Sequence, residues 1–150
     1  MSRLSDHLDE LKSFVDDLPQ EQLWERPAAD RWSMGEIVVH LIEKQDNHIE
    51  WITRMIVEDN PKLDEVQPDQ HAANPVESEL LRHRLKDFCD QRITLISLLN
   101  ALDDVQWHRE AIHPSIKHFS VEKCMEGLMR HEEYHLYDVF KIFFDVNGEG

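Results

Sequence analysis

Glycine, cysteine and long apolar runs are all scarce in this chain of 150 residues. Of its four glycines, Gly148 and Gly150 lie in the C-terminal tail, which leaves too few for a glycine-rich phosphate-binding loop or a dinucleotide fingerprint. The two cysteines, Cys89 and Cys124, form neither a disulfide framework nor a CxxC pair. No apolar run approaches the ~20 residues that span a bilayer, and the N-terminus lacks the apolar region of a secretory signal. We therefore expect a cytoplasmic protein.

Lysine and arginine are outnumbered as well. Asp and Glu total 31 against 16 Lys and Arg, which gives a formal net charge of −15. Such a charge disfavours binding to a nucleic-acid backbone, where affinity comes from basic side chains that displace counterions, and it disfavours anionic membranes. Hydrophobic residues make up 41% of the chain and charged residues 31%, which is typical of a globular protein. The length fits one domain over residues 1–150.

The chain does have clear helical periodicity. Apolar residues recur every three or four positions in four segments of about 15–26 residues each. The first covers about residues 3–17. The second follows Ser33, which can form a capping box with Glu36 three residues later. The third is expected to begin with a cap at Asn74, and the fourth at Ser120.

Two long connections, over about residues 58–74 and 103–119, separate these segments. No segment alternates convincingly in the manner of a β-strand. The sequence therefore predicts an all-α fold, a four-helix bundle with long connections between helices. Connections of this length allow a crossover, so a simple up-down-up-down topology does not follow. The residues expected to face the core include Leu80 and Ile93 in the third helix and Phe140 in the fourth.

Ten histidines occur, and the most informative are His131 and His135. They are four residues apart in a helical segment and so share one face, which is a spacing at which two imidazoles can bind one metal ion. Cys124 and Leu128 lie on the same face, so we expect the pair to look into the bundle. A pair of ordinary histidines is the alternative interpretation, although buried imidazole nitrogens in an apolar seam would need partners.

His40 is the third candidate ligand. It lies on the second helix, one turn after the predicted capping box. Metal sites in helical bundles are built from inward side chains of facing helices, and three protein ligands plus water make an open, catalytic type of coordination. Alone, a histidine in this position is more often a core or boundary residue. His7, by contrast, is expected at the surface.

The string HEEYH at 131–135 also fits the HExxH pattern of zinc proteases, with Glu132 as the general base. The metzincin continuation is absent, because Asp138 and Lys141 stand where Gly and His are required. Only 15 residues follow the motif, which leaves no room for the downstream ligand helix of a gluzincin. Glu132 also projects about 100° away from His131 on a helix, so we expect it to be solvated or to support a ligand.

Two segments together resemble the signatures of the DinB-like superfamily of metalloenzymes. The first is the run RWSMGEIVVHL over residues 31–41, in which Trp-Ser opens a helix that carries a metal-binding histidine before a leucine. The second extends from residue 113 to the HxxxH motif at 131–135. Order, separation and total length agree over essentially the whole chain. One departure is the run IKH at 116–118, where the family usually has a glycine, so the pocket rim is expected to differ.

The resemblance implies a bundle that holds a divalent metal through His40, His131 and His135. We expect Zn or Ni, and three imidazoles also suit Cu or Fe. Characterised relatives include metal-dependent hydrolases, and S-transferases and isomerases that use low-molecular-weight thiols. The leading hypothesis is therefore a metal-dependent enzyme that activates a thiol or water against a small-molecule substrate. Because members are often dimeric, we expect a homodimer.

Further residues are expected near this metal. Metal-bound imidazoles usually donate their other N–H to a carboxylate or carbonyl, and Glu36, Glu132 and Asp138 are the candidate carboxylates. His48 and Cys124 are additional candidate ligands. A closed shell of four protein ligands would instead favour a non-enzymatic, stress-related helical binding module with a structural metal.

Overall fold

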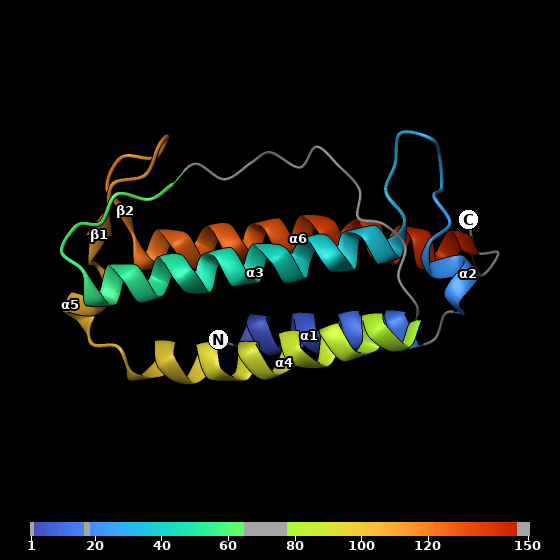
Figure 1. Cartoon of the computed structure of the whole chain (residues 1–150), viewed down its shortest axis with the longest axis horizontal. Coiled ribbons are helices and arrows are strands. Elements are labelled where there is room, and N and C mark those ends of the chain that lie inside the picture. Colours follow the sequence, from blue (N-terminus) through green and yellow to red (C-terminus); the bar gives the residue numbers. More distant parts are fainter. Residues whose placement is uncertain (1, 17–18, 65–77, 147–150) are drawn as a thin grey trace.

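The computed structural model describes residues 2–16, 19–64 and 78–146 of the chain (Figure 1). Within these residues four long helices dominate, which confirms the predicted all-α four-helix bundle. The elements are α1 (Ser2–Asp16), α2 (Gln20–Leu23), α3 (Met34–Val57), α4 (Ser78–Ala101), α5 (Asp104–Trp107), β1 (Glu110–Ala111), β2 (Phe119–Ser120) and α6 (Val121–Val146). The expected cap at Asn74 lies outside the described residues. No described helix has the length and apolar character needed to cross a membrane.

The long helices pack in a circular order that differs from their order in the chain. Helix α6 packs against both α3 and α1, and α4 packs against the same two helices. Helices α1 and α6 run in one direction, while α3 and α4 run in the other (Figure 1). Since α3 ends and α4 begins at opposite ends of the bundle, the topology is not a simple up-down-up-down arrangement. The antiparallel packing of α3 against α6 brings together the two helices that carry the candidate ligands.

One short region forms a pair of strands that no alternating pattern in the sequence indicated. Strands β1 and β2 pair in antiparallel register, Glu110 with Ser120 and Ala111 with Phe119. A single parallel bridge joins Lys62 to the backbone beside β1. Two-residue strands are too short to show an alternating pattern in the sequence. The pair fixes the end of the second long connection directly before α6 begins.

Two clusters of buried apolar side chains fill the bundle, one containing the first half of α3 and the other its second half. Helix α4 faces both clusters with a regular spacing of four and three residues, the spacing of a bundle seam. Its buried residues on that seam are Leu81, Leu85, Phe88, Arg92, Leu95 and Leu99.

Three residues expected in the core are exposed instead. Leu80 and Ile93 of α4 are 44% and 61% exposed, and Phe140 of α6 is 46% exposed. At position 92 the seam takes Arg92, which is 0% exposed, and the neighbouring Ile93 therefore turns outward. Apolar character alone therefore predicted Ile93, and not Arg92, as the buried residue. An arginine is stable in the core only with a charged partner, and this partner lies on another helix.

Candidate metal centre

The first turn of α3 is fixed by the predicted capping box. The backbone N–H of Glu36 donates to Ser33 Oγ at 3.2 Å, and the backbone N–H of Ser33 donates to Glu36 Oε1 at 3.0 Å. Arg26 donates two further hydrogen bonds to the same carboxylate, from Nε at 3.0 Å and from Nη2 at 2.9 Å. Burial raises the pKa of Glu36, but the bonds from Arg26 and Ser33 outweigh it and hold that pKa below its ordinary value. This anchor sets the helix phase at which His40 projects one turn later.

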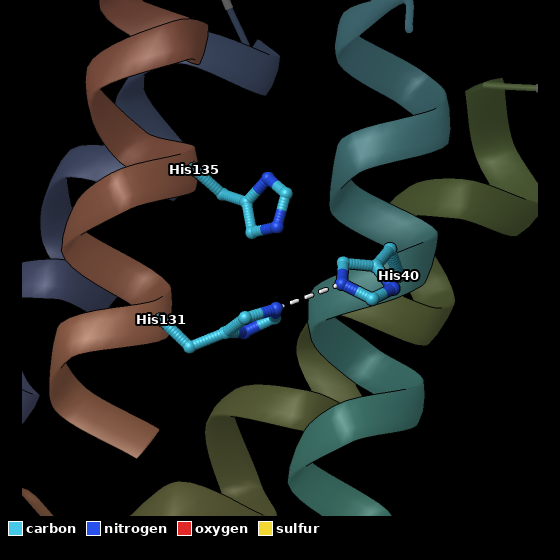
Figure 2. Close-up of side chains that lie close together, drawn as sticks. All are labelled: His40, His131 and His135. Atoms are coloured by element: carbon cyan, nitrogen blue, oxygen red, sulfur yellow. Dashed lines mark hydrogen bonds between the residues drawn. The ribbon is translucent and has the colours of Figure 1, made fainter. Parts of the chain in front are cut away.

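The three candidate histidines meet between α3 and α6 (Figure 2). One nitrogen from each ring can be chosen so that all three lie within 4.8 Å of one another. The Nε2 atoms of His40 and His131 are 2.9 Å apart. The ring centroid of His135 lies 4.8 Å from that of His40 and 4.5 Å from that of His131. Side chains separated by about 90 residues in the sequence are thus neighbours in the fold.

These distances fit a metal centre. Imidazole nitrogens bind first-row divalent ions at about 2.0–2.1 Å, so two ligands of one ion at right or tetrahedral angles lie about 2.9–3.4 Å apart. The separation of His40 and His131 already falls in this range, and a nitrogen of His135 lies within 4.8 Å of a nitrogen of each of the other two. His40 and His135 are 8% and 7% exposed, so a charge bound here would be largely shielded from solvent.

Trp32 covers the centre from the segment just before α3. Its ring meets His40 edge-on, with centroids 5.1 Å apart, and stacks on His135 at 6.2 Å. The aromatic side chain limits the directions from which a ligand can reach the histidines. Trp32 was not among the predicted site residues, although it stands directly before the capping serine.

A pocket of about 390 Å³ opens beside His135. Its walls combine aromatic, apolar and charged groups, a mixture suited to an amphipathic small molecule. It is lined by Asp30, Arg31, Trp32, Ile37, Tyr134, His135, Asp138 and Ile142. The pocket draws on the connection before α3 and on two turns of α6, so only the folded bundle assembles it.

The candidate supporting carboxylates occupy three different places. Glu36 is engaged by Arg26 and Ser33 at the helix start. Asp138 lines the pocket and pairs with Lys141 at 3.3 Å. Their roles toward a metal remain predictions.

Glu132 lies apart from the pocket, in the interior of the bundle, where Arg92 and His7 hold its carboxylate. The solvated alternative for Glu132 is wrong, since the residue is only 2% exposed. The surface prediction for His7 is also wrong, because its side chain is 11% exposed and Nδ1 lies 3.0 Å from Glu132 Oε1. These partners occupy the carboxylate and argue against Glu132 as the general base of a protease motif.

Neither additional candidate ligand belongs to the group of three. Cys124 is buried in the second core cluster, two helical turns before His131, and burial raises the pKa of its thiol to about 12. The Nδ1 of His48 lies 2.8 Å from the carbonyl oxygen of Lys44, and its ring lies beside Trp51. Burial lowers the pKa of His48. Among the described residues, the group of candidate ligands close enough for one ion contains three histidines.

Comparison with known proteins identifies the family of the chain and similar folds. The sequence profile of the DinB superfamily matches residues 3–139. YfiT from Bacillus subtilis, described as a probable metal-dependent hydrolase with an unusual four-helix bundle topology, superposes with a TM-score of 0.80 at 18% identity, covering 99% of this chain and 86% of YfiT. A conserved protein from Enterococcus faecalis superposes with a TM-score of 0.68 at 14% identity, covering 98% and 94%. No curated protein matches the sequence significantly.

Proposed function

Because this chain belongs to the DinB superfamily, we propose that it is a divalent-metal-dependent enzyme acting on a small molecule, with His40, His131 and His135 as the metal ligands. The observation that carries the proposal is the convergence of these three imidazoles from two facing helices, beside an open pocket. The description of its structural neighbour YfiT as a probable metal-dependent hydrolase supports the same class of chemistry.

In this proposal the three histidines hold the metal, and the residues that line the pocket position the substrate. A divalent ion bound by the histidines would supply Lewis acidity, which brings the pKa of a bound water or thiol close to neutrality. Trp32 and Tyr134 offer aromatic surface to the apolar part of a substrate. Arg31 and Asp138 lie on the pocket wall, where they can orient polar groups of either sign. Hydrolysis and thiol-dependent S-transfer both fit this arrangement, and three imidazoles suit Zn or Ni.

The alternative is a binding module with a structural metal. Structural zinc sites are closed by four protein ligands, whereas catalytic sites keep one position open. Cys124 and His48 were the candidates for a fourth ligand, and both lie outside the group of three among the described residues. This favours the enzyme over the module.

We also propose a homodimer. The solvent face of α6 exposes two tyrosines and a phenylalanine, Tyr134, Tyr137 and Phe140, at 67%, 63% and 46%. Clustered exposed aromatic side chains of this kind are enriched in protein interfaces. Sedimentation equilibrium of the purified chain, compared with a Tyr137→Glu variant, tests the assembly directly.

The function is tested by metal analysis followed by assays of the loaded protein. We expect about one divalent ion per chain, and turnover in esterase, amidase or thiol-conjugation panels that chelation abolishes and metal restores. Full occupancy in a His131→Ala, His135→Ala double variant would exclude the proposed site. Metal binding without turnover in any of these panels would favour the structural-metal module.

A further inference from the structure

Four polar side chains, one from each long helix, meet inside the bundle: His7 of α1, Gln45 of α3, Arg92 of α4 and Glu132 of α6. Together we name them the buried polar layer. Gln45 and Arg92 are 0% exposed and Glu132 is 2% exposed. Polar groups buried this deeply need hydrogen-bond partners within the fold.

The layer links all four helices by hydrogen bonds. Arg92 Nε donates to Gln45 Oε1 at 2.7 Å, which ties α4 to α3. Arg92 Nη1 donates to Glu132 Oε1 at 3.0 Å and Nη2 donates to Oε2, which ties α4 to α6 by a two-pronged ion pair. His7 Nδ1 lies 3.0 Å from Glu132 Oε1, and since an ionised carboxylate only accepts, the imidazole donates and ties α1 to α6.

Such a layer is a poor device for stability alone. Desolvating a charge pair costs several kcal/mol per ion, and apolar residues of similar volume are often as stable or more so. Buried polar groups in helical assemblies are best attested as devices that fix register, because a displaced helix would leave them without partners.

The layer lies close in sequence to the candidate ligands on both of their helices. Glu132 follows His131 directly and precedes His135 by three residues, and Gln45 is five residues after His40. Successive side chains on a helix point about 100° apart. With Glu132 held toward α4 and α1, the rotation of α6 directs His131 and His135 toward α3 (Figure 2). A slip of α6 by one turn, about 5.4 Å, would exceed the 4.8 Å spread of the three nitrogens.

We propose that the buried polar layer is the positioning element of the three-histidine centre. It fixes the rotation and register of α6 against α3, and thereby the distances among the three imidazoles, without contacting the ion. The role toward a metal rests on the proposed function, whereas the alignment of the imidazoles does not.

The deciding variant replaces the ion pair by apolar side chains, Arg92→Met with Glu132→Leu. We expect the variant still to fold cooperatively by urea unfolding, at somewhat lower stability because Gln45 Oε1 and His7 Nδ1 lose the partners they have in the layer. Affinity for Co²⁺ should nevertheless fall about tenfold or more, the scale found when residues that orient ligands are lost, and the visible absorption of the bound Co²⁺ should change. The matched control is Arg54→Gln with Glu58→Gln, which removes an exposed ion pair of α3 and should change neither. A folded variant with wild-type affinity and spectrum would overturn the proposal.

A second variant and a metal-free measurement complete the test. The variant Gln45→Met keeps the ion pair of Arg92 and Glu132 and removes only the hydrogen bond to α3. It decides the matter if the double variant does not fold. A weaker Co²⁺ affinity in Gln45→Met then supports the proposal, and an unchanged affinity overturns it. In metal-free wild type, ring protons of His40 and His131 should show mutual NOEs, since their centroids are 4.8 Å apart. If wild type binds no Co²⁺, the proposed function fails alone. Loss of these NOEs in the folded variant then supports positioning, and their persistence overturns it.

Discussion

The Nε2 atoms of His40 and His131 lie 2.9 Å apart, although 91 residues separate them in the sequence. In the metal-free chain one nitrogen must donate a proton to the other, whereas both would direct lone pairs at a shared ion. The same pair would thus change from a hydrogen bond to two ligands if the chain binds the proposed ion. This relationship makes the centre sensitive to metal in ways that can be measured without a substrate.

Metal should stabilise the fold through this centre. At a free ion concentration one hundred times the Kd, binding raises the free energy of unfolding by about 2.7 kcal/mol. We expect urea unfolding in the presence of Zn²⁺ or Ni²⁺ to show this gain in wild type, and His135→Ala to lose most of it. His83→Ala, which alters a histidine side chain 70% exposed on α4, is the control and should keep the full gain. Equal stabilisation of both variants would place the ion elsewhere.

Trp32 should report metal binding by fluorescence. Its ring contacts both His40 and His135, so a bound paramagnetic ion such as Co²⁺ or Ni²⁺ is expected to quench its emission. Titration of a Trp32→Phe variant should show little quenching, although the protein still binds the ion. Trp107→Phe removes an indole from α5, in the other core cluster, and should leave the quenching intact. The reverse result would contradict the placement of the centre.

The two glycines in helices should respond to alanine in opposite directions. A Cβ at Gly35 would lie 2.9 Å from ring carbons of Trp24, which packs over the first turn of α3. A rigid indole gives way poorly, so Gly35→Ala should destabilise the protein by about 1–3 kcal/mol. A Cβ at Gly127 meets nothing within 4 Å, and there alanine should stabilise α6 by about 0.5–1 kcal/mol. Urea midpoints of the two variants that move the same way would contradict this.

Stability of the metal-free protein should decline below neutral pH. Burial lowers the pKa of His48 below its ordinary 6.5, so as the pH falls through about 6.5 the unfolded chain takes up a proton that the folded chain does not. This contribution is present above pH 6.5 and is lost as the pH falls toward the folded pKa. Unfolding free energies measured from pH 7.5 to 5 should therefore fall less steeply in His48→Leu than in wild type. His83→Leu, the exposed control, should follow the wild-type slope.

At still lower pH the free energy of unfolding should decline a second time, as buried carboxylates take up protons. Burial raises the pKa of Glu132, but the hydrogen bond of His7 and the charge and hydrogen bonds of Arg92 outweigh it and hold the pKa below 4.5. Its contribution is present above about pH 4.5 and is lost as the pH falls through the folded value. The Arg92→Met, Glu132→Leu variant should show a smaller second decline, because only the contribution of Glu36, whose pKa is also lowered, remains of the two. If the free energy of unfolding of this variant fell below pH 4.5 as steeply as that of wild type, the decline would come from other carboxylates.

Much of the site could be predicted from local sequence. The Ser33–Glu36 capping box is a three-residue pattern, and the structure forms it as predicted. The shared face of His131 and His135 follows from four-residue spacing on a helix. The placement of His40 beside them rested on the family resemblance and on the inward phase of its helix, and the distances agree with it. That the three bind a metal stays a prediction.

The mispredictions of Ile93, His7 and the two short strands share one cause, which is that partners distant in the sequence decide where these residues lie. Periodicity placed Ile93 in the core because it is apolar, but the seam uses Arg92, whose charge is met by Glu132 forty residues away. His7 was assigned to the surface because nothing near it in the sequence shows that it has a buried partner. That partner, Glu132, lies on α6, 125 residues away. Strands β1 and β2 form by pairing with each other across an intervening loop, so two residues carry no local signal.

The sequence by itself determined the four amphipathic helices, the start of α3 and the face on which the HxxxH pair lies, because each depends on residues within one or two helical turns. Only the tertiary structure decided that α3 lies antiparallel to α6, that Trp32 covers the histidines, and that a layer of four polar side chains forms between the helices. Helix neighbours are selected by burial of complementary faces, and a buried charge is tolerated only where its partner arrives from elsewhere in the fold. Spacing along one helix therefore supplied two of the candidate ligands, and packing between helices brought the third beside them.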